Sequence, residues 1–348
     1  MTGKTNERIG VFGGTFDPVH MGHLLFAEAA LEQAGLSKIL FMPAHIQPFK
    51  QGEKVLSDDD RLRMLRLATR DNPCFEVSTI ETDKGGVSYT IDSLRELRTQ
   101  KEPSPLCFIL GADMYKNIGK WKEADALLRE FDIIVGLRPG YDCPKTSTER
   151  TEFISNPQIE LSSTEIRRRL ISGESIKYQV PESVRRYLLV KAKEGEKRFE
   201  HTKRVIDQSI ELAHRFDISE EKAELAALMH DYCKDPDGGI ENDVNHGGMA
   251  AEAVRSEFGI KDEDVLNAIR YHTTGRAGMS TLEKVIFLAD TLEPGRTYNS
   301  ITRLRESCLD DLEQGTYDVL VELKEYLIQK GLTVSADTEA AIKEGIVG

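Results

Sequence analysis

The sequence predicts an α/β domain built on a doubly wound parallel sheet, followed by an all-α domain. Short apolar runs alternate with amphipathic segments in the first half, whereas the second half shows helical periodicity alone. At 348 residues the chain is long for one core and sufficient for two. Residues 1–195 hold 28 basic and 28 acidic side chains, whereas residues 196–348 hold 18 and 31. We therefore expect two domains, residues 1–195 and 196–348.

Five short apolar runs in the first half are expected to be buried strands: Ile9–Phe12, Ile39–Met42, Phe75–Val77, Cys107–Leu110 and Ile133–Val135. The amphipathic segments between them are expected to be helices: Leu24–Ala34, Asp58–Ala68, Ile91–Thr99 and Glu123–Glu130. Ser57 is a suitable N-cap and Gly35 a suitable C-terminal glycine. Strands that alternate with helices form parallel βαβ units, and such sheets bind ligands at the carboxyl ends of their strands.

Seven segments of the second half have helical periodicity: Lys197–Phe216, Glu220–Asp231, Gly247–Phe258, Glu263–His272, Thr281–Leu292, Ser300–Leu312 and Tyr317–Gln329. A polar run at residues 193–196 follows a helical segment, Glu182–Val190, and marks the expected boundary. The acidic balance argues against nucleic acid as a partner of this half. Small phosphates remain possible ligands if bound metals supply positive charge.

The cysteines and the apolar runs indicate a cytoplasmic protein. The five cysteines are odd in number and form no C-x-x-C pair, as expected in a reducing compartment. The first eight residues lack the apolar core of a signal peptide, and no apolar run approaches the roughly 20 residues that span a bilayer. We expect no membrane contact, and the sequence leaves oligomerisation possible.

The loop after the first strand has the composition of a phosphate site. Gly13, Gly14 and Gly22 allow close approach of the backbone, and the following helix offers unpaired N–H groups. His20 and His23 flank Gly22 at the start of that helix, where imidazoles can donate hydrogen bonds to phosphate oxygens. Taken alone, the glycines also fit a tight turn with two solvent-exposed histidines. The complete string from Gly13 to His23 is far more specific than its parts.

A second segment, Leu161–Arg167, has the features of an anion-binding helix start. Ser162 and Glu165 have capping-box spacing, so a helix should begin here. Its first turn presents hydroxyls and amides, and Arg167 adds a charge-assisted contact. In isolation this segment is better explained as a plain helix cap with a surface arginine.

Together these two motifs resemble the H-x-G-H nucleotidylyltransferase superfamily, and most closely nicotinate-nucleotide adenylyltransferase, over about residues 8–190. The resemblance implies transfer of AMP from ATP, carried with Mg²⁺, to nicotinate mononucleotide, with pyrophosphate as the leaving group. It implies catalytic roles for His20, His23, Lys50 and Arg167. The residues that it implies for nucleotide and substrate binding are Gly13, Gly14, Thr15, Phe16, Asp17, Gly22, Tyr89, Thr90, Gly111, Asp113, Trp121, Ser162, Ser163 and Thr164.

Further segments carry this resemblance. Pro43–Lys50 is similar to the loop that ends in a phosphate-binding lysine, although Phe49 stands where the family often has histidine. Ser88–Leu94 resembles the segment that recognises nicotinate, Gly111–Asp113 the turn near the nucleotide, and Trp121 the residue that stacks on the pyridine ring. Each has a structural alternative: Trp121 in the core, Tyr89 packing on a strand, Asp113 as an N-cap and Lys50 in solvent. Phosphopantetheine and glycerol-phosphate nucleotidylyltransferases are alternatives that Ser88–Leu94 and Trp121 disfavour.

Histidines and aspartates in the second half suggest a metal site. Five of the eight histidines follow residue 200, and neutral imidazole with carboxylate suits Fe, Mn or Zn. Asp290 ends an apolar helical run and therefore needs a partner such as a metal. His214 lies roughly 220° around the helix from His201 and should not share the site.

The order of these residues resembles the HD-domain phosphohydrolases, and the flanking residues resemble the bacterial HD-domain diadenosine tetraphosphatases, over about residues 196–345. The resemblance implies that His201, His230, Asp231 and Asp290 hold one metal and that His246 and His272 complete a second. It implies an iron pair, with manganese as the alternative, a catalytic role for Asp231, and cleavage of diadenosine tetraphosphate to two ADP. Lys234 and Arg296 would contact phosphates or, alternatively, form surface ion pairs. Alternatives for this half are hydrolysis of a guanosine alarmone or a nucleoside triphosphate, and a catalytically silent regulatory module.

Overall fold

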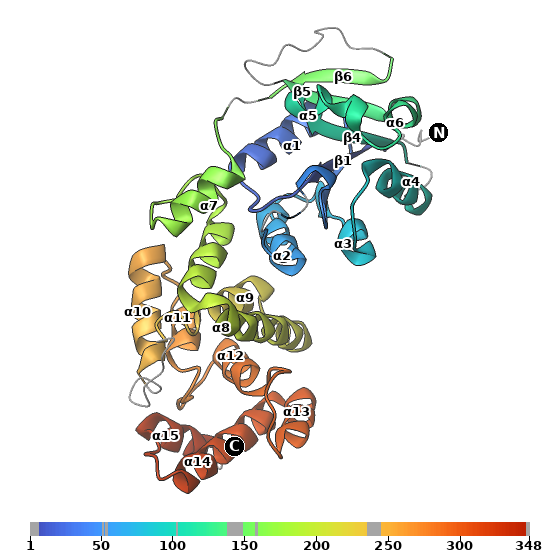
Figure 1. Cartoon of the computed structure of the whole chain (residues 1–348). Coiled ribbons are helices and arrows are strands. Elements are labelled where there is room, and N and C mark those ends of the chain that lie inside the picture. Colours follow the sequence, from blue (N-terminus) through green and yellow to red (C-terminus); the bar gives the residue numbers. More distant parts are fainter. Residues whose placement is uncertain are drawn as a thin grey trace, which may run out of the picture. The chain divides into compact units, whose positions relative to one another are not determined.

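The computed structural model describes residues 7–50, 52, 55–101, 104–137, 149–156, 159–234 and 245–345. The chain forms two compact units, Met1–Arg185 and Arg186–Gly348 (Figure 1). The boundary expected between residues 195 and 196 lies ten residues beyond this border and stays a prediction.

The first unit contains a six-stranded parallel sheet of order β3-β2-β1-β4-β5-β6. The five predicted strands are present, and a sixth, β6, forms one edge. The strands are β1 (Ile9–Gly14), β2 (Lys38–Pro43), β3 (Phe75–Val77), β4 (Leu106–Gly111), β5 (Asp132–Leu137) and β6 (Thr151–Ser155). Sequence patterning missed β6 because only two of its five residues, Thr151 and Ile154, are buried.

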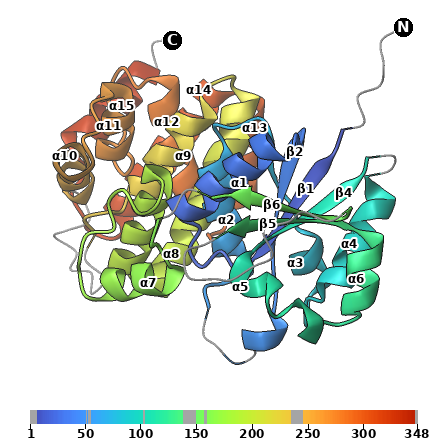
Figure 2. The ribbon, with the colours of Figure 1, turned by 90° about the horizontal axis from the view of Figure 1, so that it is seen from above.

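Helices cover both faces of this sheet, as a doubly wound fold requires (Figure 2). One face carries α1 (Met21–Gln33) and α2 (Asp58–Thr69), and the opposite face carries α4 (Thr90–Gln100) and α6 (Ala124–Glu130). Leucines of α4 and α6 pack on the sheet in one continuous apolar cluster. The shorter helical segments are η1 (Pro48–Lys50), α3 (Ile80–Lys84), α5 (Ala112–Tyr115), η2 (Ile118–Lys120) and α7 (Ser163–Ile171).

Local capping follows the sequence. The Ser57 hydroxyl accepts a hydrogen bond from the Asp60 amide at 3.1 Å and so caps α2 as predicted. Gly35 has a φ of +59° immediately after α1, the left-handed conformation that glycine adopts without strain. The helix α1 begins at Met21, three residues before the predicted Leu24, so His20 occupies its N-cap position.

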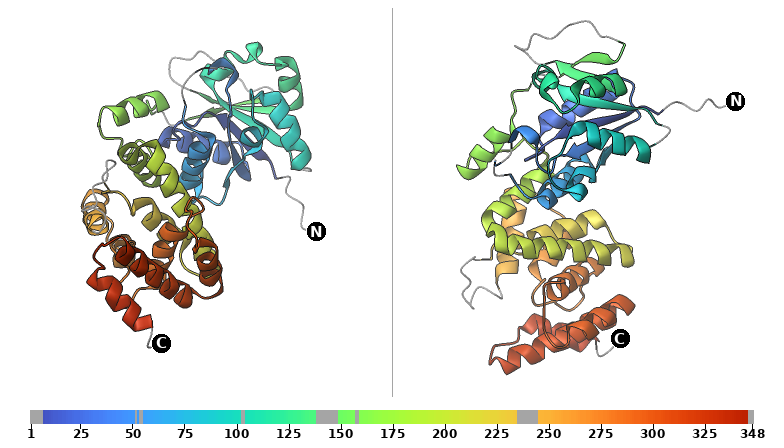
Figure 3. Two further views of the ribbon diagram at one scale, coloured as in Figure 1. Left: turned by 60° about the horizontal axis from the view of Figure 1, so that its bottom comes forward. Right: turned by 45° about the vertical axis from the view of Figure 1, so that its right-hand side comes forward.

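The second unit is all-α in its described residues (Figure 3). Helix α8 (Glu182–Arg215) begins just before the border between the units and continues into the second one. The helices that follow are α9 (Glu220–Met229), α10 (His246–Phe258), α11 (Glu263–Arg270), α12 (Thr281–Leu292), α13 (Ile301–Asp310), α14 (Leu312–Gln329) and α15 (Ala336–Gly345). The short α15 escaped prediction, and α14 begins five residues before the predicted start. In the part of the chain that the structure describes, no helix combines the length and apolar character needed to cross a bilayer.

The helix α8 joins two segments that the sequence predicts as separate helices. A single break interrupts it at Gly195, with φ 73° and ψ 168°. This combination is essentially restricted to glycine. The polar run that suggested a linker is therefore helical on both sides of one glycine.

Candidate functional site

The loop after β1 brings two histidines together at the start of α1. The rings of His20 and His23 stack with centroids 3.7 Å apart and planes 19° apart. The His20 amide donates to His23 Nδ1 at 3.2 Å, and His20 itself is only 4% exposed. A Cβ on Gly22 would lie 3.1 Å from His20 Nδ1, so a side chain at this position would displace the ring. Two imidazoles thus stand at a helix N-terminus, where the backbone favours phosphate.

The start of α7 lies against this loop. The Ser163 hydroxyl donates to the Pro18 carbonyl at 2.9 Å. The Arg167 guanidinium donates to the backbone oxygen of Asp17 and lies 3.4 Å from Asp17 Oδ2. Burial raises the pKa of Asp17, while the charge of Arg167 opposes that effect. Two motifs that are 145 residues apart in sequence therefore form one surface.

The predicted cap of α7 is present in part. The Ser162 hydroxyl accepts from the Glu165 amide at 3.2 Å. The Glu165 carboxylate, which a complete capping box would direct back to Ser162, instead binds Arg168 at 2.7 Å. The Thr164 hydroxyl lies 3.5 Å from the Arg167 guanidinium. The helix start thus presents hydroxyl groups next to a cation.

Arg61 is a positioning residue that sequence reasoning missed. Its side chain is fully buried and donates to the backbone oxygens of Thr15 at 2.8 Å and Ala44 at 2.7 Å. It also pairs with Asp58, which in turn binds His45. These contacts join the loop after β1 to the loop after β2. An arginine on the buried face of the predicted helix was the available signal.

A cavity of about 250 Å³ opens at the carboxyl ends of β1 and β2. It collects residues from three predicted motifs: Gly13, Gly14, Tyr89, Thr90 and Trp121. Trp121 is half-buried, packs against the core cluster and also lines the cavity. Its stacking on a pyridine ring stays a prediction.

The cavity also contains a buried carboxylate that sequence reasoning missed. Glu81 is 5% exposed and accepts a hydrogen bond from the Ser93 hydroxyl at 2.6 Å. Burial raises the pKa of Glu81. No sequence pattern pointed to Glu81, because the short helix α3 that contains it was itself not predicted.

Other predicted residues lie around these contacts. The Thr15 hydroxyl donates to Gln47 Oε1 at 3.1 Å, and the buried Phe16 has a φ of +51°. Gly111 ends β4 and is the N-cap of α5, whereas Asp113 lies within that helix and is therefore not its cap. Neither Gly111 nor Asp113 lines the cavity. The side chain of Lys50 falls outside the described residues, so its predicted role rests on sequence.

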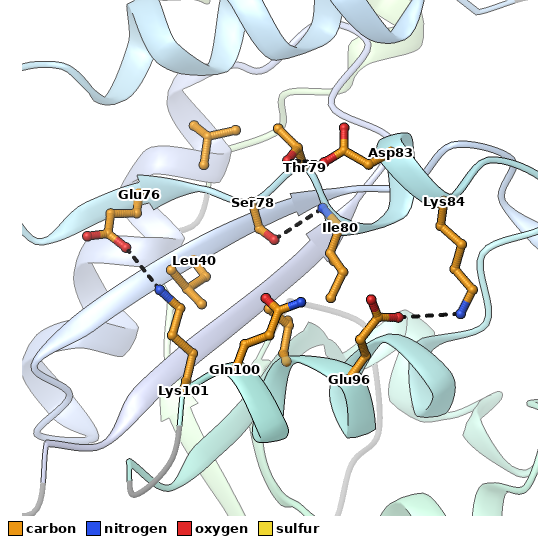
Figure 4. A pocket seen from close by; sticks show the side chains of 12 residues that line it. Leu40, Glu76, Ser78, Thr79, Ile80, Asp83, Lys84, Glu96, Gln100 and Lys101 are labelled. Carbon is orange, nitrogen blue, oxygen red and sulfur yellow. Dashed lines mark hydrogen bonds and ion pairs between the residues drawn. The ribbon is translucent and has the colours of Figure 1, made fainter.

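A larger cavity of about 550 Å³ lies between β2, β3, α3 and α4 (Figure 4). It includes none of the predicted site residues. Four of its charged groups form pairs, Lys84 with Glu96 at 3.5 Å and Lys101 with Glu76 at 3.9 Å, and Asp83 accepts a hydrogen bond from the Thr79 hydroxyl at 2.6 Å. We assign it no role in the chemistry.

The second unit gathers the six predicted metal ligands. His201, His230 and Asp290 form one group and His230, Asp231 and His272 form another, with all ligand atoms of each group within 4.8 Å of one another. His201 Nε2 lies 3.1 Å from Asp290 Oδ1. His246 Nε2 lies 3.1 Å from Asp231 Oδ1 and 3.0 Å from His272 Nε2. The two groups therefore share His230.

The histidine rings are oriented as metal ligands usually are. Nδ1 of His230 lies 2.7 Å from the Ala227 carbonyl, and Nδ1 of His272 lies 2.7 Å from the Ile269 carbonyl. A carbonyl oxygen can only accept, so each Nδ1 carries the proton and each Nε2 keeps its lone pair for a metal. His230 Nε2 is buried without a hydrogen-bond partner among the described residues. A cation would satisfy that atom, so the donor set fits a metal.

The charges of this site also suit a cation. Burial lowers the pKa of His230 to about 4, which keeps its imidazole neutral. Burial opposes ionisation of Asp231 and Asp290, but the histidines around both, with Arg296 beside Asp290, hold their pKa values below the usual range. Neutral imidazoles and ionised carboxylates are the forms that bind metals.

Three cations border the ligand carboxylates. Lys234 Nζ lies 3.4 Å from Asp231 Oδ2, and the Arg296 guanidinium lies 2.8 Å from Asp290 Oδ1. Arg198, which sequence reasoning missed, lies 3.5 Å from Asp231 Oδ2. Its position three residues before His201 on one helix face was the available signal.

The other second-half histidine has a different partner. His214 Nε2 lies 3.2 Å from the Glu220 carboxylate, and its side chain is 69% exposed.

The matches to known proteins also fall into two separate parts of the chain. A family model described as cytidylyltransferase-like matches residues 11–169, and the HD-domain model matches residues 198–295. A probable nicotinate-nucleotide adenylyltransferase from Desulfitobacterium hafniense (strain Y51) is 41% identical over 192 residues, 52% of this chain and 93% of the relative. Its counterpart from Thermoanaerobacter sp. (strain X514) is 42% identical over 192 residues, 52% of this chain and 91% of the relative. A structure from Clostridium acetobutylicum, described as a predicted HD superfamily hydrolase involved in NAD metabolism, is 33% identical to this chain. The match covers 47% of this chain and 96% of that one, with a TM-score of 0.44.

Proposed function

Because the N-terminal part of this chain belongs to the nicotinate-nucleotide adenylyltransferase family, we propose that it transfers AMP from ATP to nicotinate mononucleotide. The contact between the Gly13–His23 loop and the start of α7 carries this proposal. The hydrogen bond from Ser163 to Pro18 and the contacts of Arg167 with Asp17 hold the two phosphate-binding segments together. Such a surface suits a triphosphate.

The reaction needs positioning and charge stabilisation rather than a covalent intermediate. A phosphate oxygen of nicotinate mononucleotide attacks the α-phosphorus of ATP in line, and pyrophosphate leaves with the Mg²⁺ that ATP carries. His20 and His23 would donate hydrogen bonds to the phosphates as charge develops. Lys50 and Arg167 would add positive charge.

The remaining predicted residues bind the two substrates in this proposal. The hydroxyls of Ser162, Ser163 and Thr164 would hold the triphosphate at the start of α7, and Tyr89, Thr90 and Trp121 would hold the pyridine ring in the cavity. The residues assigned to the adenylate side and the loop are Gly13, Gly14, Thr15, Phe16, Asp17, Gly22, Gly111 and Asp113.

The test is synthesis of the dinucleotide from ATP and nicotinate mononucleotide with magnesium, measured by chromatography. We expect nicotinate adenine dinucleotide and pyrophosphate in equal amounts. His20→Ala should lower the rate at least 100-fold, whereas His214→Ala, in the other unit, should leave it unchanged. Absence of product from the unmodified protein would overturn the proposal.

For residues 196–348 we propose a metal-dependent phosphohydrolase that cleaves diadenosine tetraphosphate to two ADP. His201, His230, Asp231 and Asp290 would hold one metal, and His246 and His272 would complete a second, with iron expected and manganese as the alternative. A bound metal pair supplies an activated water and neutralises phosphate charge. The orphaned Nε2 of His230 and the fixed protons on Nδ1 support this assignment.

The cations around this centre support a polyphosphate substrate. Lys234 and Arg198 lie beside Asp231, and Arg296 lies beside Asp290. Each of these cations lies beside a proposed metal ligand, where the phosphate oxygens of a bound substrate would approach. A chain of several phosphates would bring the negative charge that such a set requires.

Metal analysis combined with a substrate screen tests this half. The purified protein is loaded with iron or manganese and offered diadenosine tetraphosphate, a guanosine alarmone and nucleoside triphosphates. Two ADP per dinucleotide would support the proposal. Faster turnover of another nucleotide would replace the substrate, and metal binding with no hydrolysis would indicate a regulatory module.

A further inference from the structure

One ligand of the proposed metal centre is oriented by a residue far away in the sequence. Nδ1 of His230 and Nδ1 of His272 each face a backbone carbonyl three residues earlier in the chain. His201 differs from these two, because its Nδ1 lies 3.2 Å from Oε1 of Glu293, a residue 92 positions further along. A side-chain carboxylate therefore sets the orientation of the His201 ring.

The position of the Glu293 carboxylate is fixed by the turn that follows α12. Glu293 is 2% exposed and is the C-cap residue of that helix. Its Oε2 accepts hydrogen bonds from Nε of Arg204 at 2.6 Å and from the amide of Gly295. A Cβ on Gly295 would lie 2.8 Å from this oxygen, so the turn has no room for a side chain there. The Arg305 guanidinium donates to the backbone carbonyl of Glu293 at 2.7 Å and also holds the turn.

The contact with Glu293 decides which nitrogen of His201 is free to bind a metal. An ionised carboxylate can only accept a hydrogen bond, so Nδ1 carries the proton. Nε2 then faces the other ligands, where it lies 3.1 Å from Oδ1 of Asp290. A carboxylate partner on one ring nitrogen also raises the basicity of the other, and a charged acceptor does so more strongly than a neutral carbonyl.

We propose that Glu293 is a positioning residue of the metal centre, which holds the His201 ring with Nε2 toward Asp290 and so tightens the binding of the divalent cation that these two ligands share. The inference rests on the metal-dependent function proposed for this half of the chain and adds a residue to it. Glu293 acts through His201 alone and binds neither the cation nor a phosphate. Its effect on metal binding should therefore disappear when the His201 ring is absent.

The test is titration of the metal-free protein with Mn²⁺, in which electron paramagnetic resonance measures the unbound ion. Glu293→Gln should raise the dissociation constant about 10- to 100-fold, the usual effect of changing the hydrogen-bond partner of a ligating histidine. In a protein that already carries His201→Ala, the same replacement should change the constant less than about twofold, because no ring is left to orient. A purely structural effect of Glu293 would weaken binding equally in both backgrounds.

Glu283→Gln is the matched control at the other end of α12. Glu283 is also 2% exposed, and its carboxylate binds the Arg276 guanidinium at 2.6 Å and the Ser280 amide rather than a histidine. The replacement removes an equally buried, arginine-paired charge from the same helix. It should leave the Mn²⁺ dissociation constant within about twofold.

Arg204 separates the contact with His201 from the ion pair at the turn. Arg204→Met removes the ion pair but keeps the carboxylate beside His201, so it should retain the affinity for Mn²⁺. The double replacement of Arg204→Met with Glu293→Gln leaves no unpaired charge at the turn, which protects the test against loss of folding in the single variant. It should bind Mn²⁺ as weakly as Glu293→Gln does.

The possible outcomes separate this inference from the proposed function. Unchanged binding in Glu293→Gln, an equal loss with and without His201, or an equal loss in Arg204→Met would overturn the inference while leaving the metal centre intact. If the unmodified protein binds no Mn²⁺, the proposed metal centre itself fails, which is a distinct result.

Discussion

The buried Glu194 should make the stability of the second unit depend on pH. Glu194 is 6% exposed, and its Oε2 accepts a hydrogen bond from the Thr202 hydroxyl at 2.7 Å. Its other oxygen is buried without a hydrogen-bond partner among the described residues. Burial is the main cause that raises the pKa of this carboxyl to about 7, and the charge of Asp231 adds to it. The perturbation is Glu194→Gln, which keeps the shape and removes the titration.

The magnitude follows from the difference between folded and unfolded pKa values. An increase from 4.5 to about 7 corresponds to about 3 kcal/mol. Because the folded state holds this proton more tightly, its contribution to stability is fully present below pH 4.5 and is lost as the pH rises through 7. Glu194→Gln should therefore match the unmodified protein below about pH 4. At pH 8 the variant should be more stable than the unmodified protein by up to about 3 kcal/mol. An unpaired amide N–H of the new glutamine would reduce this gain by roughly 1 kcal/mol.

Urea unfolding at several pH values measures this difference. Far-UV circular dichroism follows the helices of both units, while the single tryptophan, Trp121, reports on the first unit alone and serves as an internal control, so that the part of the helical signal without a matching tryptophan change belongs to the second unit. EDTA is included, so that no bound cation changes the field at Glu194. The tryptophan transition should be identical in both proteins. Parallel pH profiles of the helical transition would refute the reasoning.

Three further substitutions test the remaining arguments. Arg167→Ala should lower kcat/KM for dinucleotide formation about 100-fold, because it loosens the contact with the loop after β1. Arg168→Ala is the control: it removes only surface ion pairs and should change initial rates less than twofold. Asp290→Ala should reduce bound metal at least tenfold by elemental analysis, and retention of metal at the level of the His214→Ala protein would exclude the proposed centre. Gly195→Ala should lower the free energy of unfolding of the second unit by about 1–3 kcal/mol, because the backbone there adopts a conformation restricted to glycine; an unchanged urea midpoint would contradict this.

Local features were largely readable from the sequence. Alternating apolar and amphipathic runs predicted five of the six strands, and Ser57 and Ser162 predicted two helix starts, because periodicity and capping depend on neighbours within a few residues. The edge strand β6 escaped because only part of it is buried. The break in α8 escaped because a polar run with one glycine looks like a linker, although Gly195 permits helix on both sides.

The long-range contacts were decided by the tertiary structure. No local pattern indicates that Ser163 bonds to Pro18 or that Arg61 joins two loops. These contacts depend on the order of the strands in the sheet, because that order decides which loops, and therefore which residues, meet at the same edge.

In the second unit, too, the sequence identified the candidate residues and the tertiary structure decided which of them meet. By itself, the sequence determined which histidines and aspartates are candidate ligands, because residue type and order along the chain are enough to name them. That all six meet, that Asp231 faces both His246 and His272, and that Arg198 joins the site depended on how the five helices α8 to α12 pack. Packing is fixed by the burial of apolar faces over the whole unit, and so it lies beyond any pattern confined to a few neighbouring residues.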